Sequence, residues 1–311
     1  MLAAGFGVCA VALLLPEAEE APERFLKLLQ PFQTAGSDGA LSSVFQWITE
    51  SACLCLLTLG MITGFYVTKV PSGAIFECAA AFCILSKAND LQLPWWGMLL
   101  LLLVSGAMIG VLRRFFLPTQ KSARFLSGMM LDLMGVVLMP LLMPSKLSGI
   151  LRLPWMIPQG IDVSVLVALV FMAGVYFLLF RSSAGMPIKA SFYHQLETEG
   201  RLHAPAVFLM AASGMLVALG AGMFGLNGVS GDVYACIGIC IRSLGAACLS
   251  LLHPIWALPA SLLLQYLVSG CQRLMDIPAA AVLPELFSAA VICMYSLRRM
   301  LFRQGKEGGM A

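Results

Sequence analysis

Long runs of apolar residues separated by short polar segments are the feature that most constrains this chain. The run at residues 204–225 contains no Asp, Glu, Lys or Arg, and roughly 20 apolar residues in a helix cross the hydrocarbon core of a bilayer. Hydrophobic residues make up 60% of the sequence and charged residues only 11%, whereas soluble domains carry about 25% charged residues. The pattern predicts an integral membrane protein without a soluble domain of its own.

The apolar runs predict an all-α fold, a polytopic bundle of about eight to ten transmembrane helices. The ten candidate spans are residues 1–15, 46–67, 72–86, 94–112, 123–143, 163–180, 204–225, 234–252, 255–272 and 284–297. The segment 72–86 is short and contains Glu77, so a broken or re-entrant helix is an alternative there. Residues 17–33 combine glutamates with apolar residues at helical spacing, which predicts an amphipathic surface helix.

These spans predict three parts of the chain. Residues 1–45 form a short N-terminal span and an external amphipathic segment, residues 46–298 form the transmembrane domain, and residues 299–311 form a cytoplasmic tail. One set of alternate loops holds twelve Lys and Arg residues and the other holds six. Because loops rich in Lys and Arg stay on the cytoplasmic side, both termini are expected to face the cytoplasm.

Two segments suggest an internal repeat. Residues 97–110 and 214–225 both begin with Gly-Met-Leu and both carry small residues four positions apart. Small residues at this interval let membrane helices approach closely. The pattern is compatible with two pseudo-repeated halves, an architecture common in transporters, and equally with ordinary helix packing.

Charged residues inside apolar spans are the candidate functional residues, because such charges are costly in a bilayer. Glu77, Asp132 and Arg242 are the candidates for a translocation path. Structural roles are equally open: an ion pair between Asp132 and Arg242, and a cap by Glu77 on a broken helix. Glu285 follows Pro284, which favours a role at the start of a helix.

Sequence motifs of several function classes are absent. There is no His-Glu-x-x-His, no Gly-x-Ser-x-Gly and no Walker lysine loop. The ten cysteines lie mostly in apolar runs and lack zinc-site spacing, so they are expected to be packing residues. We therefore expect no catalytic residue, no cofactor, no metal site and no nucleic-acid partner.

A family resemblance enters at residues 181–225, which read RSSAGMPIKASFYHQLETEGRLHAPAVFLMAASGMLVALGAGMFG, and at IGICIRSLGAA further on. The segment resembles the permease subunits of the ATP-binding cassette importers for branched-chain amino acids, sugars and nucleosides. It is most similar to their putative tryptophan/tyrosine-type branch. The positions that carry the resemblance are Gly185, Ala190, Gly200, Ser213, Gly214, Leu219, Gly220, Ala221, Gly238 and Gly245. The likeness extends over roughly residues 47–298.

The resemblance implies a permease subunit that carries a small solute, an amino acid, nucleoside or sugar, across a bacterial inner membrane. Its implied partners are a second permease subunit, identical or paralogous, cytoplasmic ATPase subunits and an external solute-binding protein, with membrane lipid around it. ATP hydrolysis would belong to the partner subunits. Two rival functions stay open: an ion-coupled secondary transporter that uses Glu77 and Asp132 as cation sites, and a membrane-embedded structural or assembly subunit.

The loop at residues 181–203 is implied to contact the ATPase. We expect a short helix over residues 186–197, with Ile188 and Phe192 on one face and Gly200 at its end. The predicted coupling residues are Gly185, Ile188, Lys189, Ala190, Phe192, Glu197 and Gly200. An amphipathic helix that lies against lipid head groups is the alternative.

Overall fold

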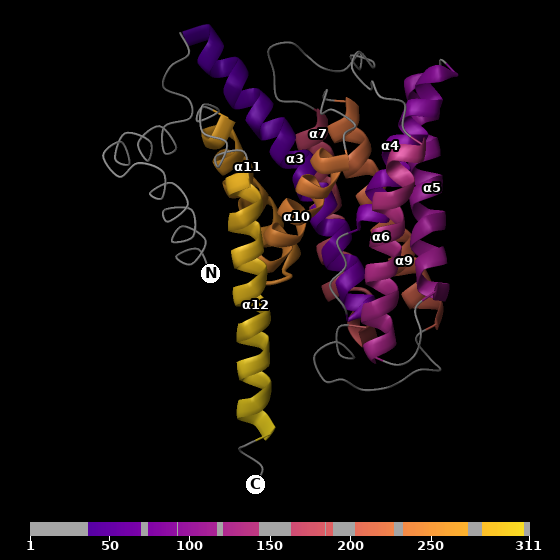
Figure 1. Cartoon of the computed structure of the whole chain (residues 1–311), viewed down its shortest axis with the longest axis vertical. Helices are drawn as coiled ribbons and strands as arrows, with labels where there is room; N and C mark the ends of the chain where they lie inside the picture. The colour runs from indigo at the N-terminus through magenta and orange to yellow at the C-terminus, as the bar shows by residue number, and fades with distance from the viewer. Residues whose placement is uncertain are drawn as a thin grey trace.

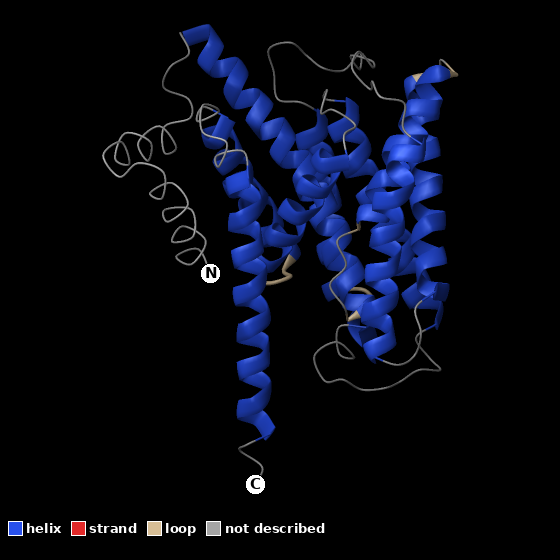
Figure 2. Cartoon of the chain, in the orientation of Figure 1, coloured by secondary structure: helices blue, strands red, loops and turns tan. Residues whose placement is uncertain are grey.

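The computed structural model describes residues 37–69, 74–91, 93–116, 121–142, 163–183, 185–188, 203–226, 233–272 and 282–307. These residues form helices and short turns and no strand (Figure 2), which confirms the predicted all-α fold. In chain order the helices are α3 (Ser37–Thr68), α4 (Ile75–Asp90), α5 (Trp95–Phe116), α6 (Lys121–Leu142), α7 (Val163–Phe180), α9 (His203–Leu226), α10 (Val233–Leu249), the 3-10 helix η2 (Pro254–Trp256), α11 (Ala257–Gln272) and α12 (Leu283–Glu307). They gather into a bundle that α12 borders on one side (Figure 1).

Helix α3 forms the centre of the bundle. It packs against α7, α9, α10 and α11, and its apolar stretch Val44–Thr68 is almost wholly buried. A helix that is apolar around its whole circumference is stable only when neighbours or lipid cover every side. The buried residues of α3 contribute to both of the large apolar clusters in the bundle, so α3 joins its two parts.

Glycines bring α5 and α9 into backbone contact. A Cβ atom on Gly110 would lie 2.1 Å from the carbonyl oxygen of Met210, and one on Gly214 would lie 2.0 Å from that of Gly106. Gly106 lies against Gly214 and Gly110 lies against Met210. Residue numbers therefore rise along α5 as they fall along α9, so the two helices are antiparallel. The segments 97–110 and 214–225 therefore pack against each other, as small residues in membrane helices allow; their origin as a repeat stays a prediction.

The predicted spans agree with the helices to within a few residues in most places. Helix α7 has the predicted bounds, and α5, α6, α9 and α10 differ by a few residues at their ends. Helix α4, at 16 residues, is as short as expected and is continuous. Two helices are longer than predicted: α3 begins at Ser37, and α12 continues to Glu307, through most of the expected tail. The predicted segments 1–15 and 17–33 lie outside the described residues.

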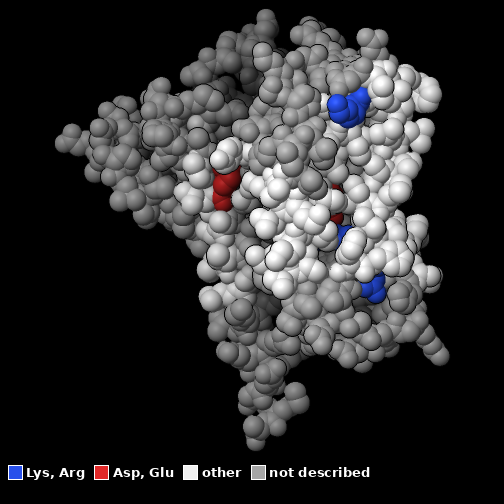
Figure 3. Space-filling model, turned by 45° about the vertical axis from the view of Figure 1, so that its right-hand side comes forward, with Lys and Arg blue, Asp and Glu red and all other residues white. Residues whose placement is uncertain are grey.

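The length and composition of the described helices indicate a membrane protein. Four stretches are long and apolar enough to cross a bilayer, namely Val44–Thr68, Trp96–Phe116, Ala204–Gly225 and Pro254–Cys271. Three shorter apolar helices are Leu126–Val137, Ser164–Phe180 and Cys236–Leu249. Large apolar side chains of α5, α6 and α7 stay exposed, among them Met108, Met130 and Val170. The face in Figure 3 shows few charged side chains among its described residues, as a lipid-facing surface requires.

Candidate functional site

The described residues include one end of the bundle where basic side chains collect. Gly64 of α3 packs against Ser213 of α9, and Gly110 of α5 packs against Met210. The C-terminal ends of α3 and α5 therefore meet the N-terminal half of α9. We call this end the basic end and the opposite one the far end. The basic residues that close α3 and α5 are Lys69, Arg113 and Arg114.

A buried ion pair lies at the basic end. Nη1 of Arg113, in the last turn of α5, donates to Oε1 of Glu77 at 2.7 Å, and the two side chains are 11% and 4% exposed. Glu77 lies in the first turn of α4, where a carboxylate also interacts favourably with the helix dipole. The pair fixes the start of α4 against the end of α5.

Asp132 caps α4 from a neighbouring helix. Its Oδ1 atom accepts a hydrogen bond from the backbone N–H of Ile75 at 3.0 Å, one of the N–H groups that a helix start leaves without an intrahelical acceptor. The alternative of an ion pair between Asp132 and Arg242 does not hold, because Arg242 pairs with Glu285. The sequence showed that both residues lie within spans, but it did not show which side of each helix they occupy.

Arg242 and Glu285 form the second ion pair. Nε of Arg242 lies 3.4 Å from Oε1 of Glu285, and the side chains are 14% and 25% exposed. The same Nε donates to the carbonyl oxygen of Gly238 at 3.2 Å. Glu285 lies in the first turn of α12, as predicted. A Cβ on Gly238 would lie 2.9 Å from Oε1 of Glu285, so the glycine makes room for the carboxylate.

The partly buried carboxylate of Glu50 and the buried amide of Gln265 extend this pair toward α3. Nε2 of Gln265 on α11 donates to Oε2 of Glu50 on α3, and Nε2 of Gln46 donates to Oε1 of Glu50 at 2.9 Å. The carboxylate of Glu50 also acts electrostatically on Arg242. We call Glu50, Arg242, Gln265 and Glu285 the Arg242 cluster. It joins α3, α10, α11 and α12 toward the far end.

Three hydroxyl groups continue from the Arg242 cluster toward the basic end. Thr58 lies two helical turns beyond Glu50 on α3, and its Oγ1 is 3.5 Å from Oγ of Ser261. Ser243, next to Arg242, has its carbonyl oxygen 3.4 Å from Oγ1 of Thr58. All three side chains are fully buried. Thr58 and Ser243 also donate to carbonyl oxygens of their own helices, so these two hydroxyls need no further acceptor.

The start of the predicted coupling loop is fixed to the end of α7. Oγ of Ser182 accepts a hydrogen bond from the N–H of Gly185 at 3.0 Å, which is the contact of an N-cap residue, and residues 185–188 form one helical turn. A Cβ on Gly185 would lie 2.0 Å from the carbonyl oxygen of Leu178. Only glycine fits at this approach.

Ile188, one of the predicted coupling residues, lies inside the bundle. Its side chain is only 4% exposed and packs against apolar neighbours, so it anchors the start of the loop. Met186, in the same turn, is 53% exposed. The predicted coupling residues Lys189, Ala190, Phe192, Glu197 and Gly200 lie outside the described residues.

Helix α7 connects this turn to the junction between α10 and α11. The rings of Tyr176 and Phe180 lie 5.9 Å and 5.0 Å from the ring of His253. His253 immediately precedes η2, and α7 also packs against α3. A displacement at the start of the loop would therefore act on α3 and on the α10–α11 junction together.

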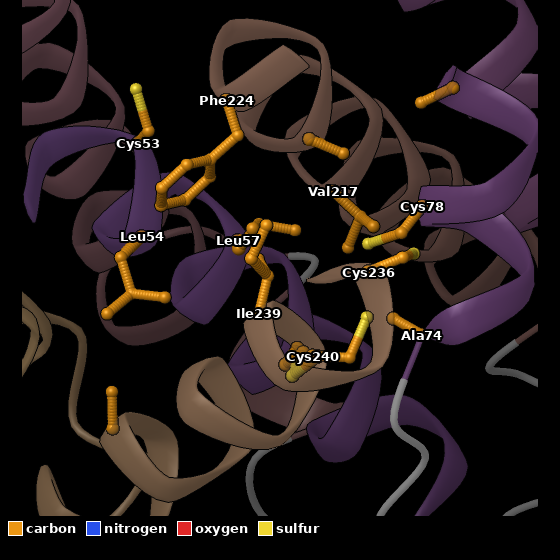
Figure 4. Close-up of a cluster of buried hydrophobic side chains, with 14 of the residues drawn as sticks. Cys53, Leu54, Leu57, Ala74, Cys78, Val217, Phe224, Cys236, Ile239 and Cys240 are labelled. Atoms are coloured by element: carbon orange, nitrogen blue, oxygen red, sulfur yellow. The ribbon is translucent and has the colours of Figure 1, made fainter. Parts of the chain in front are cut away.

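Three cysteines cluster in the apolar core. Hydrogen bonds link the side chain of Cys78 on α4 with those of Cys236 and Cys240 on α10, and the three side chains lie close together among apolar neighbours in Figure 4. Each is at most 1% exposed. These thiols thus occupy packing positions, as the sequence suggested.

The structure thus places the three predicted path residues in two locations. Glu77 and Asp132 act at the basic end, and Arg242 belongs to a separate cluster. Comparison with protein-family models, with curated proteins and with solved structures finds no match. Glu50 and Gln265 were not predicted from the sequence. An acidic residue inside the predicted span 46–67 was a signal that could have identified Glu50.

Proposed function

We propose that this chain is the permease subunit of an ATP-binding cassette importer of the branched-chain amino acid, sugar and nucleoside type. It carries a small solute across a bacterial inner membrane, with the basic end at the cytoplasmic side. Its partners are a second permease subunit, cytoplasmic ATPase subunits and an external solute-binding protein. The proposal starts from the sequence resemblance over residues 181–245, and the packing of the bundle supports it.

The observation that carries the proposal is the rigid attachment of the loop that resembles the ATPase-contacting segment. Such a loop must transmit a movement of the ATPase to the membrane helices, so its first turn has to be fixed to the bundle. The hydrogen bond to Ser182, the close approach of Gly185 to α7 and the burial of Ile188 provide this attachment. Coupled transport requires a bistable element that the remote event biases.

The distribution of charge supports the orientation. Lys69, Arg113 and Arg114 close their helices at the basic end, and cytoplasmic loops carry the excess of Lys and Arg in membrane proteins. The end of α12 adds Arg298 and three further basic residues before Glu307. With this orientation the Arg242 cluster lies toward the external side, where a solute would enter.

The polar groups inside the bundle support a path for a hydrophilic solute. A charge at the centre of a transmembrane helix costs about 2.5–3.5 kcal/mol on insertion scales and several times more by simulation. The bundle nevertheless keeps Glu50, Arg242 and Glu285 among its helices. Charged residues inside membrane spans are candidates for a functional site by default, and substrate pathways are among the roles that they mark.

The direct test is reconstitution. The chain should co-purify with an ATPase encoded beside it, and vesicles that contain the complex should accumulate solute only when ATP and the binding protein are present. Gly185→Leu should keep the chain inserted but uncouple ATP hydrolysis from uptake, whereas Ser183→Ala, at an exposed neighbouring position, should behave as wild type.

Other outcomes point to the rival functions. Uptake that an ion gradient drives without ATP would overturn the proposal in favour of a secondary transporter. Absence of both uptake and ATPase association would overturn it in favour of a structural or assembly subunit.

A further inference from the structure

The Arg242 cluster carries more hydrogen-bonding capacity than the surrounding protein uses. Oε2 of Glu285 and Oε1 of Gln265 are buried and have no hydrogen-bond partner among the described residues. Among the described residues, the guanidinium of Arg242 contacts Gly238 and Glu285 through its Nε atom, which leaves the N–H groups of Nη1 and Nη2. Buried polar groups are normally satisfied, so these buried oxygen atoms without a partner point to a ligand.

The cluster lies deep in the bundle, where contact between its charged groups and lipid would cost free energy. Arg242 lies nine residues into α10, which is about 14 Å along a helix axis and, in the proposed orientation, in the external half of a bilayer core about 30 Å thick. Its side chain is 14% exposed and that of Glu285 is 25% exposed. In known membrane proteins, charged side chains that are partly exposed at this depth face a water-filled path or other protein and do not face hydrocarbon.

The charges of the cluster select the kind of ligand. Two carboxylates act on one guanidinium, Glu285 through the ion pair and Glu50 electrostatically, so the formal charge is one negative unit. In a medium of low dielectric constant an uncompensated charge is costly, and a ligand with net positive charge removes that cost. The unused oxygen atoms of Glu285 and Gln265 accept hydrogen bonds from an ammonium group, which has three donors. The unused nitrogens of Arg242 suit a carboxylate, which they can bind through two parallel hydrogen bonds.

We propose that the Arg242 cluster is a binding site for a small solute of net positive charge that carries protonated amines and a carboxylate. The amines bind Glu285, Gln265 and Glu50, and the carboxylate binds the free edge of Arg242. The proposal rests on the transport function proposed above and names the solute class for it. Neutral sugars and nucleosides do not compensate the charge of the cluster.

Binding to the purified full-length chain in lipid nanodiscs tests the site without ATP or partner subunits. Four probes separate the contributions: free lysine has both amines and a carboxylate, putrescine lacks the carboxylate, leucine lacks the second amine, and ribose is uncharged. Each probe is measured by its shift of the unfolding temperature and by competition against labelled lysine. We expect lysine to bind most tightly, putrescine and leucine more weakly, and ribose not at all.

Conservative variants test the residues. Glu285→Gln and Glu50→Gln keep side-chain shape but remove charge, and each should weaken lysine binding about tenfold or more, since hydrogen bonds to charged groups contribute about 1.5–3 kcal/mol. Arg242→Gln should weaken lysine and leucine binding more than putrescine binding. Ser296→Ala, at an exposed position of α12 whose hydroxyl bonds only within its own helix, is the matched control and should bind lysine within about twofold of wild type.

The outcomes separate this proposal from the transport function. Absence of binding by every amine probe, ribose binding as tight as lysine binding, or unchanged lysine binding in both carboxylate variants would overturn the site or its solute class. ATP-driven uptake of a neutral solute would then leave the transport function standing. Conversely, amine binding that the variants abolish, together with a failure of ATP-driven uptake, would keep the site and overturn the importer assignment.

Discussion

The ion pair between Glu77 and Arg113 gives a prediction whose size follows from its burial. The two side chains are 4% and 11% exposed, and the bonded atoms are 2.7 Å apart. Removal of one partner from a buried pair leaves the other charge without compensation, which costs about 3–5 kcal/mol. Arg113 retains slight exposure near the end of α5, so we expect the lower part of that range, about 3 kcal/mol, for Glu77→Gln.

The double variant, Glu77→Gln with Arg113→Gln, separates the energy of the ion pair from the other effects of each substitution. Arg113→Gln alone should also cost about 3 kcal/mol, because it leaves a buried carboxylate unpaired. Glu77→Gln with Arg113→Gln leaves no charge and restores a hydrogen bond between amides, so the combined loss should be only about 4 kcal/mol. The difference from additivity, about 2 kcal/mol, is the coupling energy expected of residues in direct contact.

Reversible unfolding of the purified chain in mixed micelles measures these free energies. Lys87→Gln is the control, because Lys87 is exposed at the other end of α4, and it should change stability by less than about 0.5 kcal/mol. Additive losses in the double variant would refute direct pairing. Single losses below about 1 kcal/mol would show that water reaches the pair and that the burial argument fails.

Three further predictions follow from other contacts. Gly110→Leu should separate α5 from α9 and cost about 3 kcal/mol or more in the same unfolding measurement, because the built Cβ lies 2.1 Å from a backbone oxygen; normal stability would refute the close packing. Asp132→Asn keeps an acceptor for the N–H of Ile75, so it should cost less than Asp132→Ala, which should lose about 1 kcal/mol; equal losses would refute the cap. In a cysteine-free background, an impermeant reagent should label a cysteine at Leu91 in intact cells and not one at Ser183, and the reverse would invert the proposed orientation.

Most of the fold could be predicted because span positions follow from hydropathy alone. A bilayer offers no acceptor to an unpaired backbone group, so each long apolar run must be helical, and α7 begins and ends where its run does. The helix ends that were placed wrongly lie where a helix continues beyond its apolar run into polar residues. Helix α12 continues into a segment of Arg, Gln, Lys and Glu, residues with good helix propensity, so a hydropathy criterion places its end too early.

The partners of the charged residues could not be predicted, because the position of a residue within an apolar run gives its depth in the membrane, whereas a run that is apolar on every side leaves its direction around the helix undetermined. Arg242 and Asp132 both lie well inside their helices, yet Arg242 meets Glu285 because α10 and α12 run side by side and Gly238 leaves space for the carboxylate. The contact between Glu50 and Gln265 depends in the same way on α3 passing beside α11. Once these directions are known, the inference about function changes. The single predicted path through Glu77, Asp132 and Arg242 separates into a basic-end group whose charges fix α4 in place and a cluster around Arg242 that retains unused donors and acceptors, and the proposed solute site is the second.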